Sequence, residues 1–142
     1  MAVAVSRAVF SGDAEKLQRL IDKFMVESIS SFDGANEGFY HGMMLGLCAV
    51  VSNRYKIRSN RESGLGRFDI MLLPRDKSLP GFIYEIKYSK DERADLNVLA
   101  EAALEQIDDK KYDVELRDSG ADNIVKVGIA FRGKNAVVKS KQ

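Results

Sequence analysis

The strongest constraint on the fold is a near-continuous apolar run, 124–131, that follows a long helical pattern. Such a run is typical of a strand covered on both faces. Apolar residues spaced three and four apart predict a helix over 95–116, and another strand-like run, 82–88, precedes it. A helix that links one strand to a doubly covered strand is what a crossover between parallel neighbours requires. We therefore expect a parallel pair of strands in the sheet.

Two more helical patterns and three more strand-like runs complete the predicted order. They are helices over 13–30 and 35–52, and strands over 54–60, 67–73 and 136–138. Asp13 is the expected N-cap of the first helix. The loops between the first three strands are short and contain Gly and Pro, which is typical of an antiparallel meander. The predicted fold class is α/β: a mixed central sheet, made of a three-stranded meander, a crossover helix and further strands, flanked by helices on both faces.

The composition indicates a single globular domain and excludes several kinds of site. The chain has 142 residues, of which 45% are hydrophobic and 30% charged, and its net charge is +1. So small a charge creates no global field that attracts nucleic acid, so any anion-binding surface must be local. The single cysteine, Cys48, excludes an intramolecular disulfide and a Cys-rich zinc site, and its apolar helical setting predicts burial.

No segment of the sequence indicates a membrane or secreted protein. The longest apolar runs fall well short of the roughly 20 residues that cross a bilayer. The apolar opening, residues 1–5, is too short for the core of a signal peptide and lacks its charge pattern. We therefore expect a cytoplasmic protein with no membrane partner.

Three charged residues interrupt the predicted strands and are the first candidates for chemistry. Glu85 and Lys87 alternate with apolar residues, so they project from the same face of their strand. Asp69 joins them if the two strands are neighbours. One interpretation is a buried salt bridge between Lys87 and a carboxylate, which leaves the other carboxylate uncompensated. The other is a magnesium-dependent phosphodiesterase site, in which a hard divalent cation supplies the missing charge.

Three polar residues on the predicted helices are further candidates. Glu37 and His41 are four residues apart, hence on one helix face, and such a pair can ligate metal. Because His41 is the only histidine, a tris-histidine zinc site is impossible. Glu37 can equally be a first-turn acid favoured by the helix dipole, and His41 a half-buried polar contact. Gln106 lies at the edge of the apolar stripe of its helix, and the sequence alone favours a rim position over a site position.

Basic residues are concentrated just before Asp69. Against one acid, Glu62, this segment holds Arg54, Lys56, Arg58, Arg61 and Arg67. Contact with the phosphates of a nucleic acid is one interpretation. An exposed edge strand whose charges prevent aggregation is the other. No phosphate-binding loop motif occurs anywhere in the chain.

Taken together, these residues resemble the PD-(D/E)xK nuclease superfamily. More narrowly, they resemble its branch at the C-terminus of bacterial and archaeal proteins that carry an AAA-type ATPase-like domain. The matching blocks are residues 36–41, 59–70, 84–87, 102–107 and 126–131. Phe68 departs from the motif, which has proline before the aspartate. The resemblance implies a restriction-endonuclease-like core.

The resemblance also implies roles for the candidate residues. Asp69 and Glu85 would be ligands of Mg²⁺ or Mn²⁺, and Lys87 the catalytic lysine. Gln106 would assist the site, and Glu37 would be an additional ligand or a water-positioning group. His41 is a possible accessory residue on the helix of Glu37. The implied activity is that of a metal-dependent DNA endonuclease, and Lys56, Arg58, Arg61 and Arg67 would contact the nucleic acid.

The expected domain organisation follows from the same blocks. We expect a nuclease-like domain over 31–142, preceded by a helical lead-in, 1–30, that ends a preceding region. The ATPase-like portion, which would be a partner of this domain, is missing from the sequence, so we expect an excised domain. The alternative function is a non-catalytic nucleic-acid-binding or regulatory module of a larger ATPase-like protein. A homodimer with a shared basic face is also compatible with the sequence.

Overall fold

One mixed five-stranded sheet organises the chain, in the order β1-β2-β3-β4-β5. The computed structural model describes residues 7–8, 11–28, 37–59, 69–109, 113–118 and 120–142. The strands are β1 (Tyr55–Ser59), β2 (Ile70–Pro74), β3 (Gly81–Tyr88), β4 (Ile124–Arg132) and β5 (Asn135–Lys141). β1, β2 and β3 form an antiparallel meander, β3 and β4 are parallel, and β5 returns antiparallel to β4. The predicted fold class, including its parallel crossover, is confirmed.

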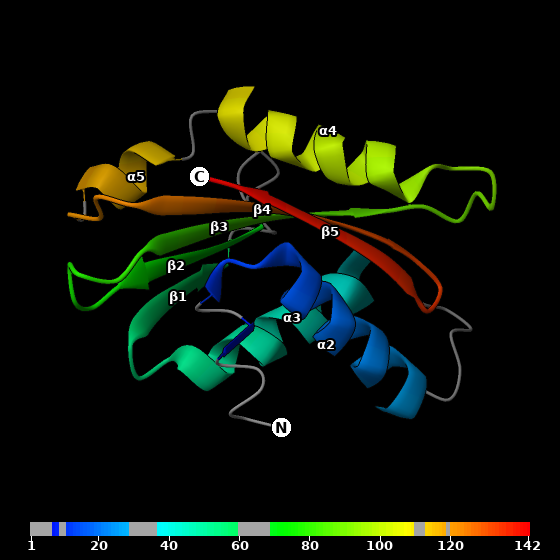
Figure 1. Ribbon diagram of the computed structural model, residues 1–142, viewed down its shortest axis with the longest axis horizontal. Helices are drawn as coiled ribbons and strands as arrows, with labels where there is room; N and C mark the ends of the chain where they lie inside the picture. Colours follow the sequence, from blue (N-terminus) through cyan, green and yellow to red (C-terminus); the bar gives the residue numbers. More distant parts are fainter. Residues whose placement is uncertain (1–6, 9–10, 29–36, 60–68, 110–112, 119) are drawn as a thin grey trace.

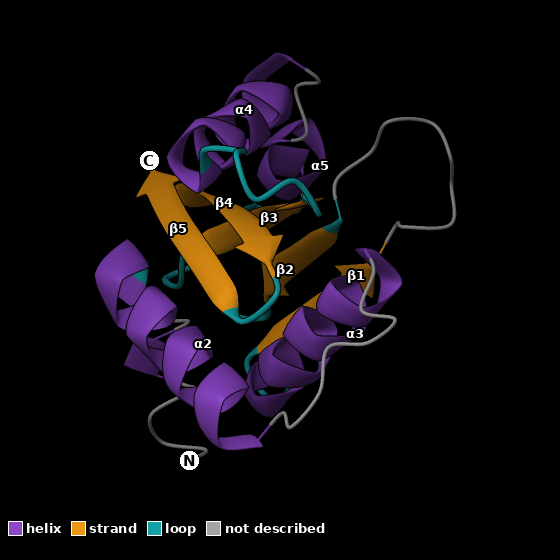
Figure 2. Cartoon of the chain, turned by 90° about the vertical axis from the view of Figure 1, so that its right-hand side faces the viewer, coloured by secondary structure: helices purple, strands orange, loops and turns teal. Residues whose placement is uncertain are grey.

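Helices cover both faces of this sheet (Figure 1). They are α2 (Ala14–Ser28), α3 (Glu37–Cys48) with the short 3₁₀ turn η1 (Ala49–Val51), α4 (Leu96–Asp109) and α5 (Asp113–Asp118). α4 and α5 lie on one face, and α2 and α3 on the other, as Figure 2 also shows. Among the described helices, none is long and apolar enough to span a bilayer.

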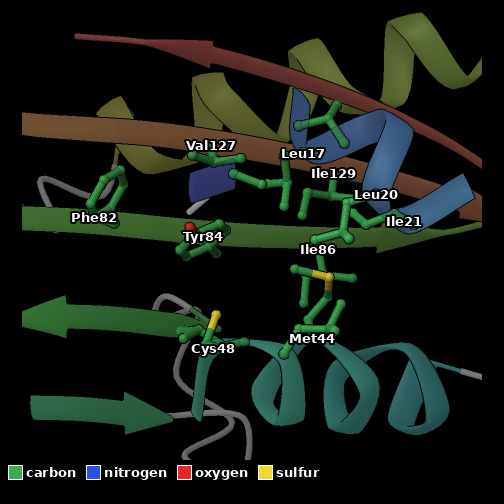
Figure 3. Close-up of a cluster of buried hydrophobic side chains, with 14 of the residues drawn as sticks. Leu17, Leu20, Ile21, Met44, Cys48, Phe82, Tyr84, Ile86, Val127 and Ile129 are labelled. Atoms are coloured by element: carbon green, nitrogen blue, oxygen red, sulfur yellow. The ribbon is translucent and has the colours of Figure 1, made fainter. Parts of the chain in front are cut away.

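The larger part of the core lies between the sheet and the helices α2 and α3. Figure 3 shows side chains of β3 and β4 packed against these two helices. A smaller cluster fills the opposite face, under α4 and α5. Successive residues of β2 alternate between the two: Ile70 and Leu72 belong to the first cluster, and Met71 to the second. The alternation places odd-numbered residues of β2 and β3 on the α4 face.

The N-cap of α2 and the burial of Cys48 are as predicted from the sequence. The Asp13 carboxylate Oδ1 accepts hydrogen bonds from the backbone N–H groups of Glu15 (2.9 Å) and Lys16 (3.3 Å), as an N-cap does. Cys48 is fully buried under the sheet. Both predictions are confirmed.

The predicted helix over 95–116 is wrong in one respect, because α4 ends at Asp109 and a separate helix, α5, begins at Asp113. The apolar stripe of α4 ends at Ile107, since the next two stripe positions hold Lys110 and Lys111. The prediction of a final strand over 136–138 is too short, since β5 runs to Lys141. Its polar C-terminal half lies at the edge of the sheet, where alternating lysines obscure the apolar pattern.

A glycine of β4 lets α4 lie unusually close to the sheet. A Cβ atom on Gly128 would stand 2.4 Å from the Ala100 carbonyl oxygen and 3.0 Å from the Ala103 Cβ. No side chain fits in that space without moving the helix. Gly128 pairs in register with Glu85, so the close approach occurs beside a candidate site residue.

Candidate active site

Asp69 lies immediately before β2 and is joined to β3 at two points. Its backbone N–H donates to the Tyr84 carbonyl oxygen at 3.2 Å, and its carboxylate Oδ2 accepts from the Ile86 N–H at 2.7 Å. These two residues flank Glu85. The β2–β3 register, in which Ile70 faces Tyr84, extends by one step to place Asp69 opposite Glu85. The two candidate residues are therefore neighbours across the meander.

Glu85 and Lys87 meet α4 through a single amide. The side chain of Gln106 donates from Nε2 to Glu85 Oε1 at 2.9 Å, and its Oε1 accepts a hydrogen bond from Lys87 Nζ. Glu85 is only 4% exposed, whereas Lys87 and Gln106 are half-buried. The rim position favoured for Gln106 is thus wrong: the amide lies between the two charged groups. The helix phase that brings it there depends on how α4 packs, which periodicity does not specify.

The simple salt-bridge interpretation of Lys87 is not what the structure shows. Among the described residues, the Lys87 ammonium bonds to the Gln106 amide oxygen and makes no ion pair with Asp69 or Glu85. An ammonium bonded to a neutral amide keeps its full charge and further donor protons. It can therefore act on a third group brought into the site.

His41 reaches the site from α3, on the opposite face of the sheet. It is buried, and its Nε2 lies 2.7 Å from Ser59 Oγ at the end of β1. Its Nδ1 lies 3.8 Å from Asp69 Oδ1. The polar contact expected for His41 is thus found, with an unexpected partner, but the ring is buried and not half-buried. Sequence analysis missed Ser59, because a serine at a strand end carries no distinguishing pattern.

The remaining candidates are only partly placed. α3 begins at Glu37, but the side chain of Glu37 lies outside the described residues, as do Arg61 and Arg67. Lys56 and Arg58 are exposed on β1, an edge strand. Both the nucleic-acid contact and the guarded edge remain compatible with this position.

The exposed basic pair lies on the same face of the sheet as Glu85. Arg58 pairs in register with Met71, and Met71 with Ile83, which shares the face of Glu85. α4 packs over β3, β4 and β5 on this face. Over β1 the same face therefore presents Lys56 and Arg58 to solvent beside the carboxylates.

The ligand types at this position suit a hard divalent cation. Asp69 and Glu85 share one register position, and the Glu85 carboxylate lies beside an amide that also binds the Lys87 ammonium. Among the residues that the structure describes, no group of three or more His, Cys, Asp and Glu side chains is arranged to hold a metal ion. Mg²⁺ needs no such cage, because it keeps several waters and binds through one or two carboxylates plus substrate oxygens.

Two ionisable groups beneath β3 are chemically silent. Burial raises the pKa of the Cys48 thiol to about 12. Burial also raises the pKa of the Tyr84 hydroxyl well above its ordinary value. Both groups stay protonated at neutral pH, so Cys48 does not supply the thiolate that a covalent mechanism needs.

Comparison with known protein families decides which fold family this arrangement represents. The model of the PD-(D/E)XK nuclease superfamily matches residues 35–141. The chain belongs to the PD-(D/E)XK nuclease superfamily. A search among curated proteins finds no significant match.

The residues just described lie within the matched range. Within the matched residues, Glu85, Ile86 and Lys87 have the pattern (D/E)XK, and an aspartate, Asp69, lies before them in the sequence. PD-(D/E)XK nucleases generally use divalent metal ions, which agrees with the carboxylate pair. The five-stranded sheet flanked by helices is consistent with the restriction-endonuclease-like fold of the superfamily.

Proposed function

We propose that this domain is a metal-dependent phosphodiesterase that cleaves DNA. Two observations carry the proposal: Asp69 is hydrogen-bonded to β3 beside Glu85, and the Gln106 amide binds both Glu85 and Lys87. Burying carboxylates at one position costs free energy unless a cation or hydrogen bonds compensate for it. A domain that needed only its shape would gain nothing from this arrangement.

Asp69 and Glu85 would hold the ion, Mg²⁺ or Mn²⁺, through their carboxylate oxygens. The superfamily resemblance adds Glu37 as a further ligand or water-positioning group. When bound, the ion would stabilise negative charge on the phosphate and favour ionisation of an attacking water. Asp69 Oδ2 already accepts from the Ile86 N–H, so this carboxylate is oriented before any ion binds.

Lys87 would supply the positive charge that the protein itself brings to the reaction. Its ammonium would orient the attacking water and offset charge on the phosphate. The water oxygen forms a bond to phosphorus, the bond to the leaving oxygen breaks, and the leaving oxygen takes up a proton. Gln106 would hold Lys87 and Glu85 at a fixed separation while this happens.

The DNA backbone would cross the face that carries Lys56 and Arg58 on its way to the carboxylates. Both side chains are exposed on β1, on the face of Glu85. For Arg61 and Arg67 the proposal rests on the sequence alone. Because the net charge is only +1, we expect weak DNA affinity for the domain by itself. A preceding ATPase-like region or a second copy of the chain would strengthen this DNA affinity. The proposed location of the protein is the cytoplasm.

A second candidate function is a non-catalytic nucleic-acid-binding or regulatory module of a larger ATPase-like protein. The near-zero net charge and the modest basic segment between Arg54 and Arg67 favour it. The two functions differ in one requirement: only the enzyme needs a metal ion at Asp69 and Glu85.

Calorimetric titration with Mg²⁺ and Mn²⁺ tests the proposal directly. We expect weak binding by the wild type that is lost in Asp69→Asn and in Glu85→Gln. Glu105→Gln is the matched control, because Glu105 is an exposed acid of α4 next to Gln106. Its binding should equal that of the wild type, which would show that the loss is specific to the carboxylate pair.

Cleavage assays on supercoiled, single-stranded and branched DNA follow from that titration. We expect metal-dependent cleavage by the wild type and none by Lys87→Ala. If the wild type binds no metal even with DNA present, the proposed activity is wrong and the second candidate replaces it. Metal binding without cleavage of any substrate would equally overturn the catalytic proposal for the domain by itself.

A further inference from the structure

The side chain of His41, on α3, contacts residues at the end of β1 and immediately before β2. Its ring lies in the space between α3 and the end of the β1–β2 pair, with Nε2 at 2.7 Å from Ser59 Oγ and Nδ1 at 3.8 Å from Asp69 Oδ1. Only 7% of its side chain and 13% of the Asp69 side chain are exposed. We propose that His41 is a positioning residue, which holds the Asp69 carboxylate in its metal-binding orientation.

The chemistry of the two partners determines how the ring is used. A neutral imidazole has one donor and one acceptor nitrogen. An ionised carboxylate can only accept, so the proton belongs on Nδ1, which faces Asp69. Nε2 is then the acceptor, and the Ser59 hydroxyl donates to it. The Nδ1 distance of 3.8 Å is longer than a hydrogen bond, so this contact is an electrostatic attraction to Oδ1.

His41 and the backbone of β3 thus act on different oxygens of the same carboxylate. Ile86 N–H fixes Oδ2 at 2.7 Å, whereas the imidazole attracts Oδ1. Because these two contacts fall on different oxygens, they oppose rotation of the carboxylate about its Cβ–Cγ bond from both sides. Metal binding then costs little conformational entropy, because the Asp69 carboxylate is already ordered. Residues that orient a metal ligand in this way increase metal affinity.

The hydrogen bond with Ser59 fixes the orientation of the His41 ring. Ser59 is the last residue of β1, and Asp69 immediately precedes β2. The two residues bracket segment 60–68, which holds Arg61 and Arg67. His41 therefore contacts the end of β1 and the residue before β2 from one helix. The inference rests on the proposed function, because His41 can position Asp69 for metal binding only if Asp69 binds metal.

Two substitutions separate the two contacts of the ring. Asparagine places its amide where His Nδ1 lies, so His41→Asn keeps a polar group beside Asp69. Glutamine reaches to the position of Nε2, so His41→Gln keeps a group beside Ser59 and leaves Asp69 without the contact. We expect His41→Gln to weaken Mg²⁺ binding by about 10- to 100-fold, as loss of such supporting residues does, and His41→Asn to recover most of it.

Gly42→Ala is the matched control. Gly42 neighbours His41 on the exposed side of α3, and an added Cβ meets nothing within 4 Å. Its Mg²⁺ affinity should be that of the wild type. Thermal unfolding of each variant reports whether it is folded. Equal loss of metal affinity in His41→Asn and His41→Gln would show that the ring acts through packing and would overturn the inference.

The single histidine makes a direct spectroscopic test possible. Labelling histidine with ¹⁵N yields one imidazole signal set, which needs no assignment. At about pH 8, where an imidazole is normally neutral, we expect the Nδ1–H tautomer and strong broadening of the ring signals by Mn²⁺. The Nε2–H tautomer would overturn the bonding scheme.

The outcomes separate failure of this inference from failure of the proposed function. If the wild type binds Mg²⁺ and folded His41→Gln binds it equally well, only the role of His41 is wrong. If the wild type binds no metal and Mn²⁺ leaves the ring signals sharp, the nuclease proposal itself is wrong, and the role of His41 falls with it.

Discussion

Asp69 is hydrogen-bonded to the residues on both sides of Glu85, through the Tyr84 carbonyl oxygen and the Ile86 N–H. Asp69 precedes β2 and Glu85 lies in β3, and the register of the meander places the two residues opposite each other. A metal site built this way depends on strand register more than on long flexible side chains.

Replacing Gln106 tests how Glu85 and Lys87 depend on a shared amide. Gln106→Ala removes the donor to Glu85 Oε1 and the acceptor of the Lys87 ammonium. Because Glu85 is buried, we expect the free energy of unfolding to fall by about 1–3 kcal/mol. Denaturant titration measures it. Gln106→Glu sharpens the test: its extra carboxylate should lower Tm without metal, and Mg²⁺ should raise that Tm more than it raises the wild-type value. No difference in the metal response would contradict the assignment.

Gly128→Ala tests the close approach of α4 to β4. The new Cβ would lie 2.4 Å from the Ala100 carbonyl oxygen, so the helix must move. We expect a loss of about 1–3 kcal/mol in the free energy of unfolding, measured by denaturant titration. Gly42→Ala, on an open helix surface, should be neutral or stabilising by up to about 1 kcal/mol. Equal stability of the two variants would show that α4 does not need the space above Gly128.

Asp108 predicts a specific dependence of stability on acid. Hydrogen bonds from Lys126 and Lys141 hold the pKa of its carboxyl below the ordinary 3.8. A lowered pKa stabilises the fold above the unfolded-state value, and that contribution disappears as the pH falls through the folded-state value. Because Asp108 is partly exposed, we expect Asp108→Asn to cost about 0.5–1 kcal/mol near neutral pH.

Unfolding measured across the acid range checks this prediction. The difference in free energy of unfolding between wild type and Asp108→Asn should shrink as the pH falls below 3.8. Asp109→Asn changes the net charge equally at an exposed neighbour and should show no such difference. A gap between wild type and Asp108→Asn that is constant with pH would contradict the role given to the carboxylate.

Cys48 should be inert in the native protein. Burial raises the pKa of its thiol to about 12, and the thiolate is the reactive form. We expect an aromatic disulfide reagent to label the denatured chain at once and the native protein only as fast as it opens. Rapid labelling without denaturant would show that the core beneath β3 opens readily.

The sequence allowed the order of elements and the location of the carboxylates to be predicted from period-two patterns. Alternation put Glu85 and Lys87 on one face, and the short loops implied that the strand of Asp69 lies beside them. Both follow from local geometry, since a strand has only two faces. The parallel crossover followed from the doubly covered strand, β4.

Contacts that depend on the packing of a helix could not be predicted in the same way. Gln106 reaches Glu85 because α4 lies close to β4 above Gly128, a distance that no periodicity contains. His41 meets Ser59 and Asp69 because α3 lies at one end of the meander. The spacing of Glu37 and His41 left His41 open between a metal ligand and a polar contact, and only the family resemblance moved Gln106 from the rim to the site.

The pairing of Asp69 with Glu85 determines where the chain can change in length. The connection between β2 and β3, residues 75–80, lies at the far end of the hairpin from both carboxylates. Residues inserted there would lengthen the turn and leave every pair of the two strands in place. A single residue inserted within either strand would instead turn one carboxylate to the opposite face of the sheet, away from the other. We therefore expect the site to tolerate longer turns between β2 and β3. One extra residue within β2 or β3 should disrupt it.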